Sequence, residues 1–348
     1  ITCSVSLLSL ILSQSTHFPR ILDPAPRFGI MQRLKIGDTV AVLAPSGGAA
    51  GVFPQVARLG IARLDKVFGL KVVVYPSAKD SEPSVKQRAD DLNRAFSDTN
   101  IKAIISTIGG EESIRILPYL DAKVIARNKK WFLGYSDCTS IHLFLFNLGI
   151  PSIYGGALMC QFATSGKSML EFTERSIRAA LFQGEERVEM FSSPKLLLDY
   201  NNWALGNRES LALPDMVDHD GWSWKGWAPG QKVQKARVFI GCLSTLIDHF
   251  IVKKYLPPFE VLNGCVFCVE TSESMPCAGT VYGFFQALGV LGILHKFQAV
   301  CVGIPKTRFL GQKPGQGEEQ FKLEQKEAIL RAMRRFAPKL PLIFDLEF

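Results

Sequence analysis

Short apolar runs alternate with segments of helical spacing from residue 36 to residue 154. Strands that alternate with helices along a chain form a parallel sheet, and the helices cover both of its faces. We therefore expect a parallel-sheet α/β domain in this half of the chain. The expected strands lie within 36–45, 70–75, 101–107, 131–133 and 150–154, and the expected helices within 56–68, 85–96, 114–120 and 141–146.

Three turns rich in glycine or serine follow expected strands of this sheet. They are Gly47-Gly48, Gly109-Gly110 and the turn that contains Ser136. Because functional sites in parallel sheets form at the carboxyl ends of the strands, we expect the three turns to converge on one rim. Gly47-Gly48 fits neither the dinucleotide-binding fingerprint nor the P-loop, because it lacks a third glycine and a Gly-Lys-Ser/Thr sequence. A nucleotide-phosphate loop, and with it a Rossmann-like dinucleotide enzyme, is therefore disfavoured.

The stretch Gly134-Tyr135-Ser136-Asp137 joins the end of an expected strand to the start of an expected helix. A serine on such a sharp turn has its hydroxyl exposed, and the next backbone N–H lies at the helix N-terminus. That geometry suits a nucleophile. Local chemistry alone favours a simpler interpretation, in which Ser136 or Asp137 only caps the helix.

The second half of the chain begins with a polar, irregular stretch that leads into a second expected α/β unit. The stretch from 184 to 235 holds four of the five tryptophans, among them Trp203. A tryptophan here could stack on a ring of a ligand, but packing the linker onto the domains is favoured for any single one. The later expected elements are a glycine turn and helix within 239–249, strands at 264–269, 299–304 and 341–348, and helices at 281–288 and 318–336.

The composition excludes several classes of function. The chain has 348 residues and a net charge of +8, and its Lys and Arg residues are scattered, so nucleic-acid binding is not implied. No apolar run reaches the about 20 residues that span a bilayer. Cys265 and Cys268 have CxxC spacing, but on a strand they face opposite sides and cannot share a metal or a bridge. We expect no metal, no cofactor and no membrane partner, and reduced thiols in a cytoplasmic protein.

Several short motifs follow one another along the chain in an order typical of one protein family. They are Gly37-Asp38, Ala44-Pro45-Ser46, Ile108-Gly109-Gly110, Leu117 to Asp121, Lys130 to Thr139, Tyr154-Gly155-Gly156, Gly241-Cys242-Leu243 and Val269 to Glu273. Together they resemble the LD-carboxypeptidase family of serine peptidases, which also contains the microcin C self-immunity peptidases. The resemblance runs from about residue 33 to residue 348.

The resemblance implies an N-terminal parallel-sheet domain of flavodoxin-like type with a second, smaller α/β C-terminal domain. It also implies a Ser-His-Glu triad, in which Ser136 is the nucleophile and Glu270 orients the histidine. The oxyanion hole would use the N–H of Asp137 and that of Gly110, and Gly109 and Trp203 would contact substrate. Without the resemblance, a strand-end carboxylate in solvent is the favoured interpretation of Glu270.

The triad histidine is the difficulty in this assignment. In the family it lies in a Gly-His pair directly after a strand patterned like 342–348, so we expect it beyond Phe348. The five histidines present are better explained as structural or surface residues: His17, His142, His219, His249 and His295. The alternative to an active peptidase is an inactive homologue that binds a small ligand.

The sequence departs from the family pattern in ways that suggest a branch. Ile240-Gly241-Cys242 stands where Gly-Gly-Asn is usual, while Glu111-Glu112 and Glu273 are closer to the microcin-immunity branch. The expected substrate is a small peptide of cell-wall type or a peptidyl-nucleotide, and the expected assembly is a homodimer. We expect a poorly ordered extension at 1–30 and a nucleophile domain at 31–184. A linker at 185–235 then leads to a C-terminal domain at 236–348 that is truncated at its end.

Overall fold

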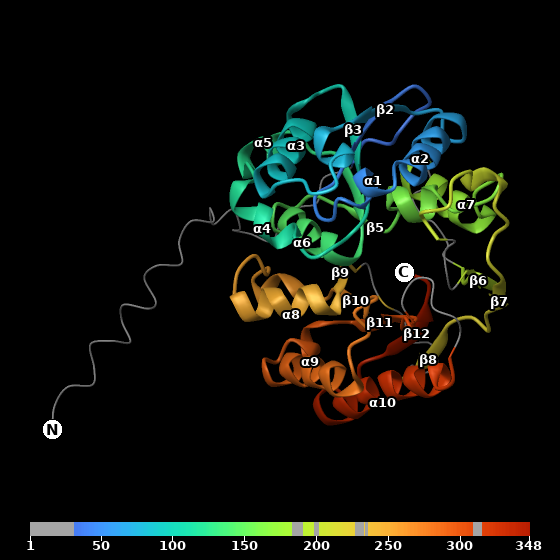
Figure 1. The fold of residues 1–348 in the computed structure, drawn as a ribbon. Helices are drawn as coiled ribbons and strands as arrows, with labels where there is room; N and C mark the ends of the chain where they lie inside the picture. The colour runs from blue at the N-terminus through green and yellow to red at the C-terminus, as the bar shows by residue number, and fades with distance from the viewer. Residues whose placement is uncertain (1–30, 183–190, 198–201, 227–232, 234–235, 309–314) are drawn as a thin grey trace, which may run out of the picture.

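The structure is a computed structural model that describes residues 31–182, 191–197, 202–226, 233, 236–308 and 315–348. It contains two α/β domains, each built on a five-stranded sheet, one above the other in Figure 1. The expected extension at 1–30 and both domain boundaries near 184 and 235 fall on or beside residues outside this description, so these boundaries stay predictions. No helix within the described ranges is long and apolar enough to cross a membrane.

The N-terminal sheet is parallel throughout, with the strand order β2-β1-β3-β4-β5. This order is that of the flavodoxin-like fold, which confirms the expected architecture. Its strands are β1 (Thr39–Leu43), β2 (Lys71–Val74), β3 (Ile101–Ser106), β4 (Trp131–Gly134) and β5 (Ile153–Tyr154). The helices of this domain are α1 (Ala49–Val52), α2 (Pro54–Lys66), α3 (Val85–Ser97), α4 (Ser113–Ile116), α5 (Ala122–Arg127), α6 (Thr139–Asn147) and α7 (Glu171–Leu181).

Apolar side chains on both faces of this sheet are buried beneath helices. Along β1, Val40 and Val42 enter one core with residues of α2 and α7, while Ala41 and Leu43 enter a second core with residues of α3 and α6. The alternation follows from the period of two in a strand. Because both faces are covered, the loops at the carboxyl ends of the strands are left to form a site.

The C-terminal sheet has the order β8-β12-β11-β10-β9, with only β8 antiparallel. Its strands are β8 (Ser223–Lys225), β9 (Val238–Cys242), β10 (Val266–Glu270), β11 (Ala299–Gly303) and β12 (Leu342–Leu346). The turn that we expected at the start of 239–249 is wrong, although the helix after it is present. Strand β9 occupies 238–242, and α8 (Leu243–Val252) follows it without a loop. The apolar residues run on from strand into helix, so periodicity does not separate them.

One face of the C-terminal sheet is covered by α8, α9 (Ala278–Val290) and α10 (Glu318–Phe336). This core contains several phenylalanines, and the rings of Phe267 and Phe297 stack with their centroids 5.0 Å apart. The opposite face carries a small cluster that includes Cys268 and Cys301. Cys265 lies in the helix-covered core instead, which confirms that the CxxC pair is split between two faces of the sheet.

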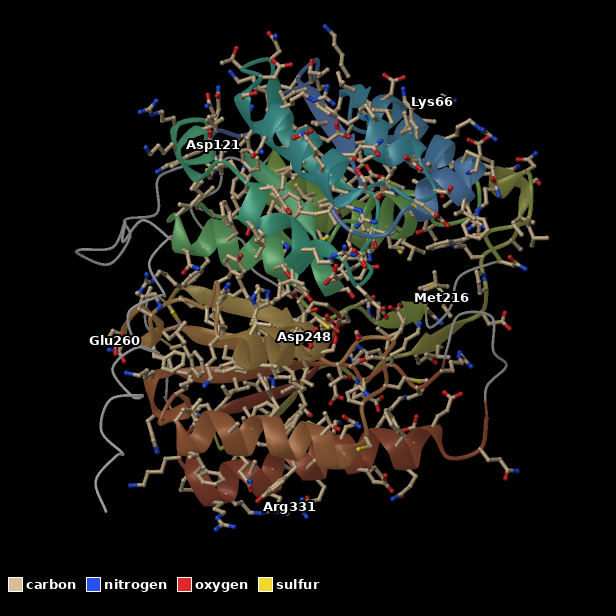
Figure 2. All side chains as sticks on the ribbon, turned by 60° about the vertical axis from the view of Figure 1, so that its left-hand side comes forward. Lys66, Asp121, Met216, Asp248, Glu260 and Arg331 are labelled. Carbon is tan, nitrogen blue, oxygen red and sulfur yellow. The ribbon has the colours of Figure 1, made fainter. Side chains whose placement is uncertain are left out.

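The two domains meet along α6 and α8. Leu143 of α6 is buried in the core of the C-terminal domain, and Ser140 Oγ lies 3.0 Å from Nε2 of His249 in α8. Part of the linker is described as a small antiparallel pair, β6 (Lys195–Leu197) with β7 (Met216–Asp218). Charged side chains project from the outer surfaces of both domains, as Lys66, Asp121, Glu260 and Arg331 do in Figure 2.

Candidate active site

The turn after β4 has the strand-turn-helix form expected from the sequence. Ser136 has φ +56°, in the left-handed region that costs an L-residue about 1–2 kcal/mol. A short 3₁₀ turn covers Ser136–Cys138, and α6 begins at Thr139. Backbone strain at a serine between a strand and a helix is the geometry of a nucleophile elbow. It is not the extended conformation of a helix-capping residue.

Position 134 requires glycine, because the turn is packed too closely for a side chain there. A β-carbon on Gly134 would lie 2.8 Å from Oγ of Ser106 and 3.0 Å from Cβ of Cys138. The Gly134 carbonyl accepts a hydrogen bond of 2.8 Å from Nε2 of His142, and Nδ1 of this ring lies 2.7 Å from Oγ of Ser152. Since a carbonyl can only accept, Nε2 of this ring carries a proton. Burial lowers the pKa of His142 to about 4.

The three turns predicted to share one rim do converge. The Gly47 N–H donates to the carbonyl of Gly109 at 2.9 Å. A β-carbon on Gly109 would lie 3.0 Å from Cβ and 3.2 Å from Oγ of Ser136, and one on Gly110 would lie 2.5 Å from Oγ of Ser46. Gly110 also has φ +147°. The backbone of this turn therefore passes directly beside the Ser136 hydroxyl, where a side chain would block it.

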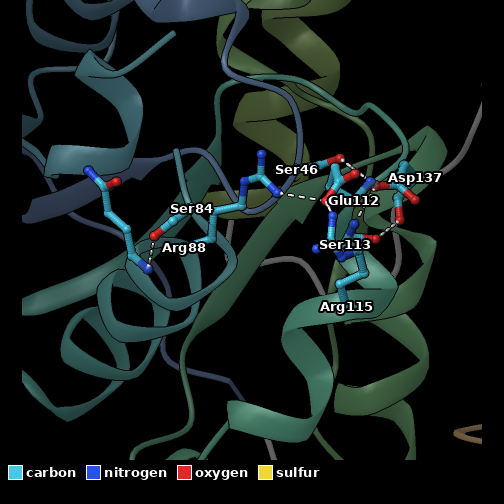
Figure 3. A network of polar contacts seen from close by, with 8 residues as sticks. Ser46, Ser84, Arg88, Glu112, Ser113, Arg115 and Asp137 are labelled. Atoms are coloured by element: carbon cyan, nitrogen blue, oxygen red, sulfur yellow. Dashed lines mark hydrogen bonds and ion pairs between the residues drawn. The ribbon is translucent and has the colours of Figure 1, made fainter. Parts of the chain in front are cut away.

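Asp137 fixes these turns to one another through its buried carboxylate (Figure 3). Oδ2 accepts the hydroxyl of Ser46 and the backbone N–H groups of Glu112 at 3.0 Å and Ser113 at 2.8 Å. The Asp137 carbonyl accepts a further bond of 2.5 Å from the hydroxyl of Ser113. The sequence suggested the N–H of Asp137 as an oxyanion donor, or Asp137 as a cap of the helix that follows it, and did not indicate this role. A carboxylate at the start of a short helix was the available signal.

Glu112 extends the same network toward the surface. Its Oε2 lies 3.2 Å from Nη1 of Arg88 in α3 and 2.5 Å from Nη1 of Arg115 in α4 (Figure 3). Arg88 is buried, whereas Arg115 is largely exposed. The contact between Glu112 and Arg88 therefore connects the segment after Gly109-Gly110 to helix α3.

Glu270 is the last residue of β10 and is buried at the junction of the two domains. Oε1 accepts the hydroxyl of Tyr154 at 2.6 Å, and Oε2 accepts the N–H of Ser272 at 2.6 Å. The Tyr154 oxygen in turn accepts the N–H of Ser136 at 3.0 Å. One hydroxyl thus connects the two residues that the sequence singled out. Burial raises the pKa of Glu270, although these two hydrogen bonds oppose the shift.

Phe348 and Glu270 both lie beside Gly303. A β-carbon on Gly303 would be 3.0 Å from Cβ of Glu270 and 3.0 Å from the carbonyl oxygen of Phe348. Figure 1 shows the end of the chain at the junction between the domains. Cys242 is also close, and burial followed by the charge of Glu270 raises the pKa of its thiol to about 11.

Three of the four described histidines have polar partners, none of which is Ser136 or Glu270. His142 supports Gly134, and His249 lies between Ser140 and the carbonyl of Lys254. His219 lies 3.1 Å from Oε1 of Glu347, with the carbonyl of Ser193 as a second partner. His295 is exposed, and His17 lies outside the described residues.

Trp203 packs on the N-terminal domain at the start of α2. Its ring meets that of Phe53 edge to face with centroids 5.8 Å apart, and its carbonyl accepts a bond of 2.5 Å from Gln55 Nε2. These contacts agree with the linker-packing interpretation. They do not include Ser136 or Glu270, so contact of Trp203 with substrate stays a prediction. Within the described part of the chain, no cluster of three or more His, Cys, Asp or Glu could hold a metal.

Comparison with known proteins agrees with this geometry. Residues 40–155 match the model of the LD-carboxypeptidase N-terminal domain. A putative carboxypeptidase of Vibrio cholerae is 26% identical over 78% of this chain and 78% of its own length. The microcin C7 self-immunity protein MccF of Escherichia coli is 26% identical over 78% of this chain and 76% of its own length.

Solved structures show the same fold over nearly the whole chain. An MccF-like protein from Streptococcus pneumoniae, determined in complex with AMP, superposes with a TM-score of 0.74 at 25% identity. The match covers 89% of this chain and 90% of that one. The chain thus has two α/β domains of this fold and a serine turn at their junction. Its N-terminal domain matches that of the LD-carboxypeptidase family, and over most of its length the chain is similar to MccF and to the MccF-like protein.

Proposed function

We propose that this protein is a serine peptidase or amidase that cleaves a peptide or amide bond near a free carboxylate. Ser136 is the nucleophile, and Glu270 orients the base. The N–H groups of Asp137 and Gly110 stabilise the oxyanion, and Gly109 leaves room for the substrate. The observation that carries the proposal is the contact chain from Ser136 through the Tyr154 hydroxyl to Glu270.

The assigned groups have the chemistry that acyl transfer needs. A serine hydroxyl attacks a carbonyl only when a base takes its proton, and a carboxylate must hold that base in the correct tautomer. Each preset N–H donor that faces the developing oxyanion lowers the barrier by about 3 kcal/mol. Glu270 sits at the end of a strand and is fixed by two hydrogen bonds, so its orientation is set before substrate arrives.

We propose that the base is a histidine that follows Phe348. The proximity of Phe348 and Glu270 to Gly303 supports this, since a residue shortly after Phe348 could reach the carboxylate. Of the described histidines, His142, His219 and His249 are held by other partners, and His295 is exposed. That same observation favours a second candidate function, an inactive homologue that keeps the cleft and binds a small ligand.

The proposed substrates are a tetrapeptide of cell-wall type and a peptidyl-nucleotide conjugate. AMP in the MccF-like protein from Streptococcus pneumoniae supports the nucleotide, and the carboxypeptidase relatives support the peptide. Both substrates are anionic, and the net charge of +8 favours their approach. Homodimer formation and a cytoplasmic location remain expectations of the sequence.

Hydrolysis assays with both substrates test the proposal. A chain that continues past Phe348 should turn substrate over, and Ser136→Ala should lower kcat by about 10⁴-fold or more. Ser97→Ala, on the exposed end of α3, is the matched control and should retain full activity. Binding without turnover by the longer chain would support the inactive homologue. Equal, Ser136-dependent activity in the chain ending at Phe348 would show that the base is misplaced.

A further inference from the structure

Both backbone polar groups of Ser136 are held by side-chain hydroxyls. The N–H of Ser136 donates to the Tyr154 oxygen at 3.0 Å, and its carbonyl accepts the hydroxyl of Thr139 at 2.6 Å. Neither hydroxyl belongs to a group assigned above as nucleophile, base support or oxyanion donor. Thr139 is fully buried, so its bonds are shielded from competing water.

Each hydroxyl also reaches the C-terminal domain. Tyr154 donates to Oε1 of Glu270 at 2.6 Å, at the end of β10. Thr139 accepts the N–H of Cys242 at 2.9 Å, at the end of β9. Glu270 and Cys242 lie opposite each other in the register of these neighbouring strands. The nucleophile turn is therefore joined by two bridges to the carboxyl ends of two neighbouring strands, β9 and β10, of the second sheet.

The direction of every bond in the two bridges is fixed by chemistry. A hydroxyl has one hydrogen, and a carboxylate or carbonyl can only accept it. The Tyr154 hydrogen must go to Glu270, so its oxygen accepts from Ser136. The Thr139 hydrogen must go to the Ser136 carbonyl, so its oxygen accepts from Cys242. A methyl group or a hydrogen atom in place of either hydroxyl breaks both bonds of that bridge.

We propose that Tyr154 and Thr139 are positioning residues that form a hydroxyl clamp on Ser136. The clamp holds the strained turn and sets the distance between Ser136 and Glu270 across the domain junction. A left-handed serine persists only where its surroundings over-determine it, and the two bridges supply that constraint. The catalytic part of this inference rests on the function proposed above.

Kinetics of single variants test the clamp in the chain that continues past Phe348. Tyr154→Phe and Thr139→Val should each lower kcat by on the order of 10²-fold and leave KM within about twofold, because a misplacement near 1 Å has that effect. Thr139→Ser keeps the hydroxyl and should restore most of kcat. Tyr119→Phe, on a largely exposed side chain, is the matched control and should behave as the parent. Unchanged kcat, or no rescue by serine, would overturn the inference.

Hydrogen exchange gives a readout that does not need activity. In the chain ending at Phe348, Tyr154→Phe should speed exchange of the Ser136 amide, and Thr139→Val that of the Cys242 amide, each by about 10-fold or more. The urea midpoint should shift little in Tyr154→Phe, which separates local release from unfolding. Unchanged exchange would refute the clamp. If exchange changes as expected but the unmutated longer chain shows no turnover that depends on Ser136, only the proposed function is refuted.

Discussion

At the scale of single residues, the serine turn depends on groups that do no chemistry themselves. His142 is one of them, since its neutral ring donates to the carbonyl of Gly134 from inside α6. The positive φ of Ser136 needs such support, because the turn would otherwise relax to a helical or extended conformation. Local sequence patterns predicted the turn but not its supports, whose partners lie on other elements.

The titration of His142 gives a testable dependence of stability on pH. Burial lowers its pKa from 6.5 to about 4, so between these values the unfolded chain binds a proton that the folded chain does not. The contribution of His142 to the free energy of unfolding is therefore complete above pH 6.5. It falls as the pH drops toward 4, by about 3 kcal/mol in total. Urea unfolding of His142→Gln should show a smaller loss of unfolding free energy over this range than the parent. His295→Gln, at an exposed histidine, should follow the parent, and an unchanged slope in His142→Gln would contradict the assignment.

At the scale of elements, most strands and helices were predictable, and the exceptions have a physical reason. The long helix at 318–336 carries a clear apolar stripe, and its bounds agree with α10. Strand β9 was missed because Gly241 predicts a turn, whereas it lies inside the strand, where a β-carbon would be 2.7 Å from Cγ2 of Thr139. The extent of this strand is set by pairing with β10, which is a contact between distant parts of the chain.

Close packing of α9 on α10 provides a second prediction, because it depends on a glycine. A β-carbon on Gly289 would lie 2.4 Å from Cγ and 2.6 Å from Cβ of Phe336. Gly289→Ala should therefore lower the free energy of unfolding by about 1–3 kcal/mol. Gly283→Ala in the same helix meets nothing within 4 Å and should raise it by about 0.5–1 kcal/mol. Urea denaturation measures both, and a shift of the same sign in the two variants would refute the packing argument.

At the scale of the whole molecule, the candidate site exists only where the two domains meet. The sequence identified Ser136 and Glu270 through a family pattern, and the three turns of the N-terminal sheet through strand order. It did not identify Tyr154 as the link, because Tyr154 and Glu270 are 116 positions apart and no local pattern joins them. The hydroxyls of Thr139 and Ser46 were missed for the same reason.

Covalent labelling tests most directly whether a serine in one domain depends on a carboxylate in the other. A chain extended past Phe348 is treated with a fluorophosphonate probe beside its Glu270→Gln variant, and adducts are mapped by mass spectrometry. We expect one adduct, on Ser136, that forms about 10²-fold or more slowly in the variant. An adduct on another serine, or equal rates in both proteins, would contradict the account.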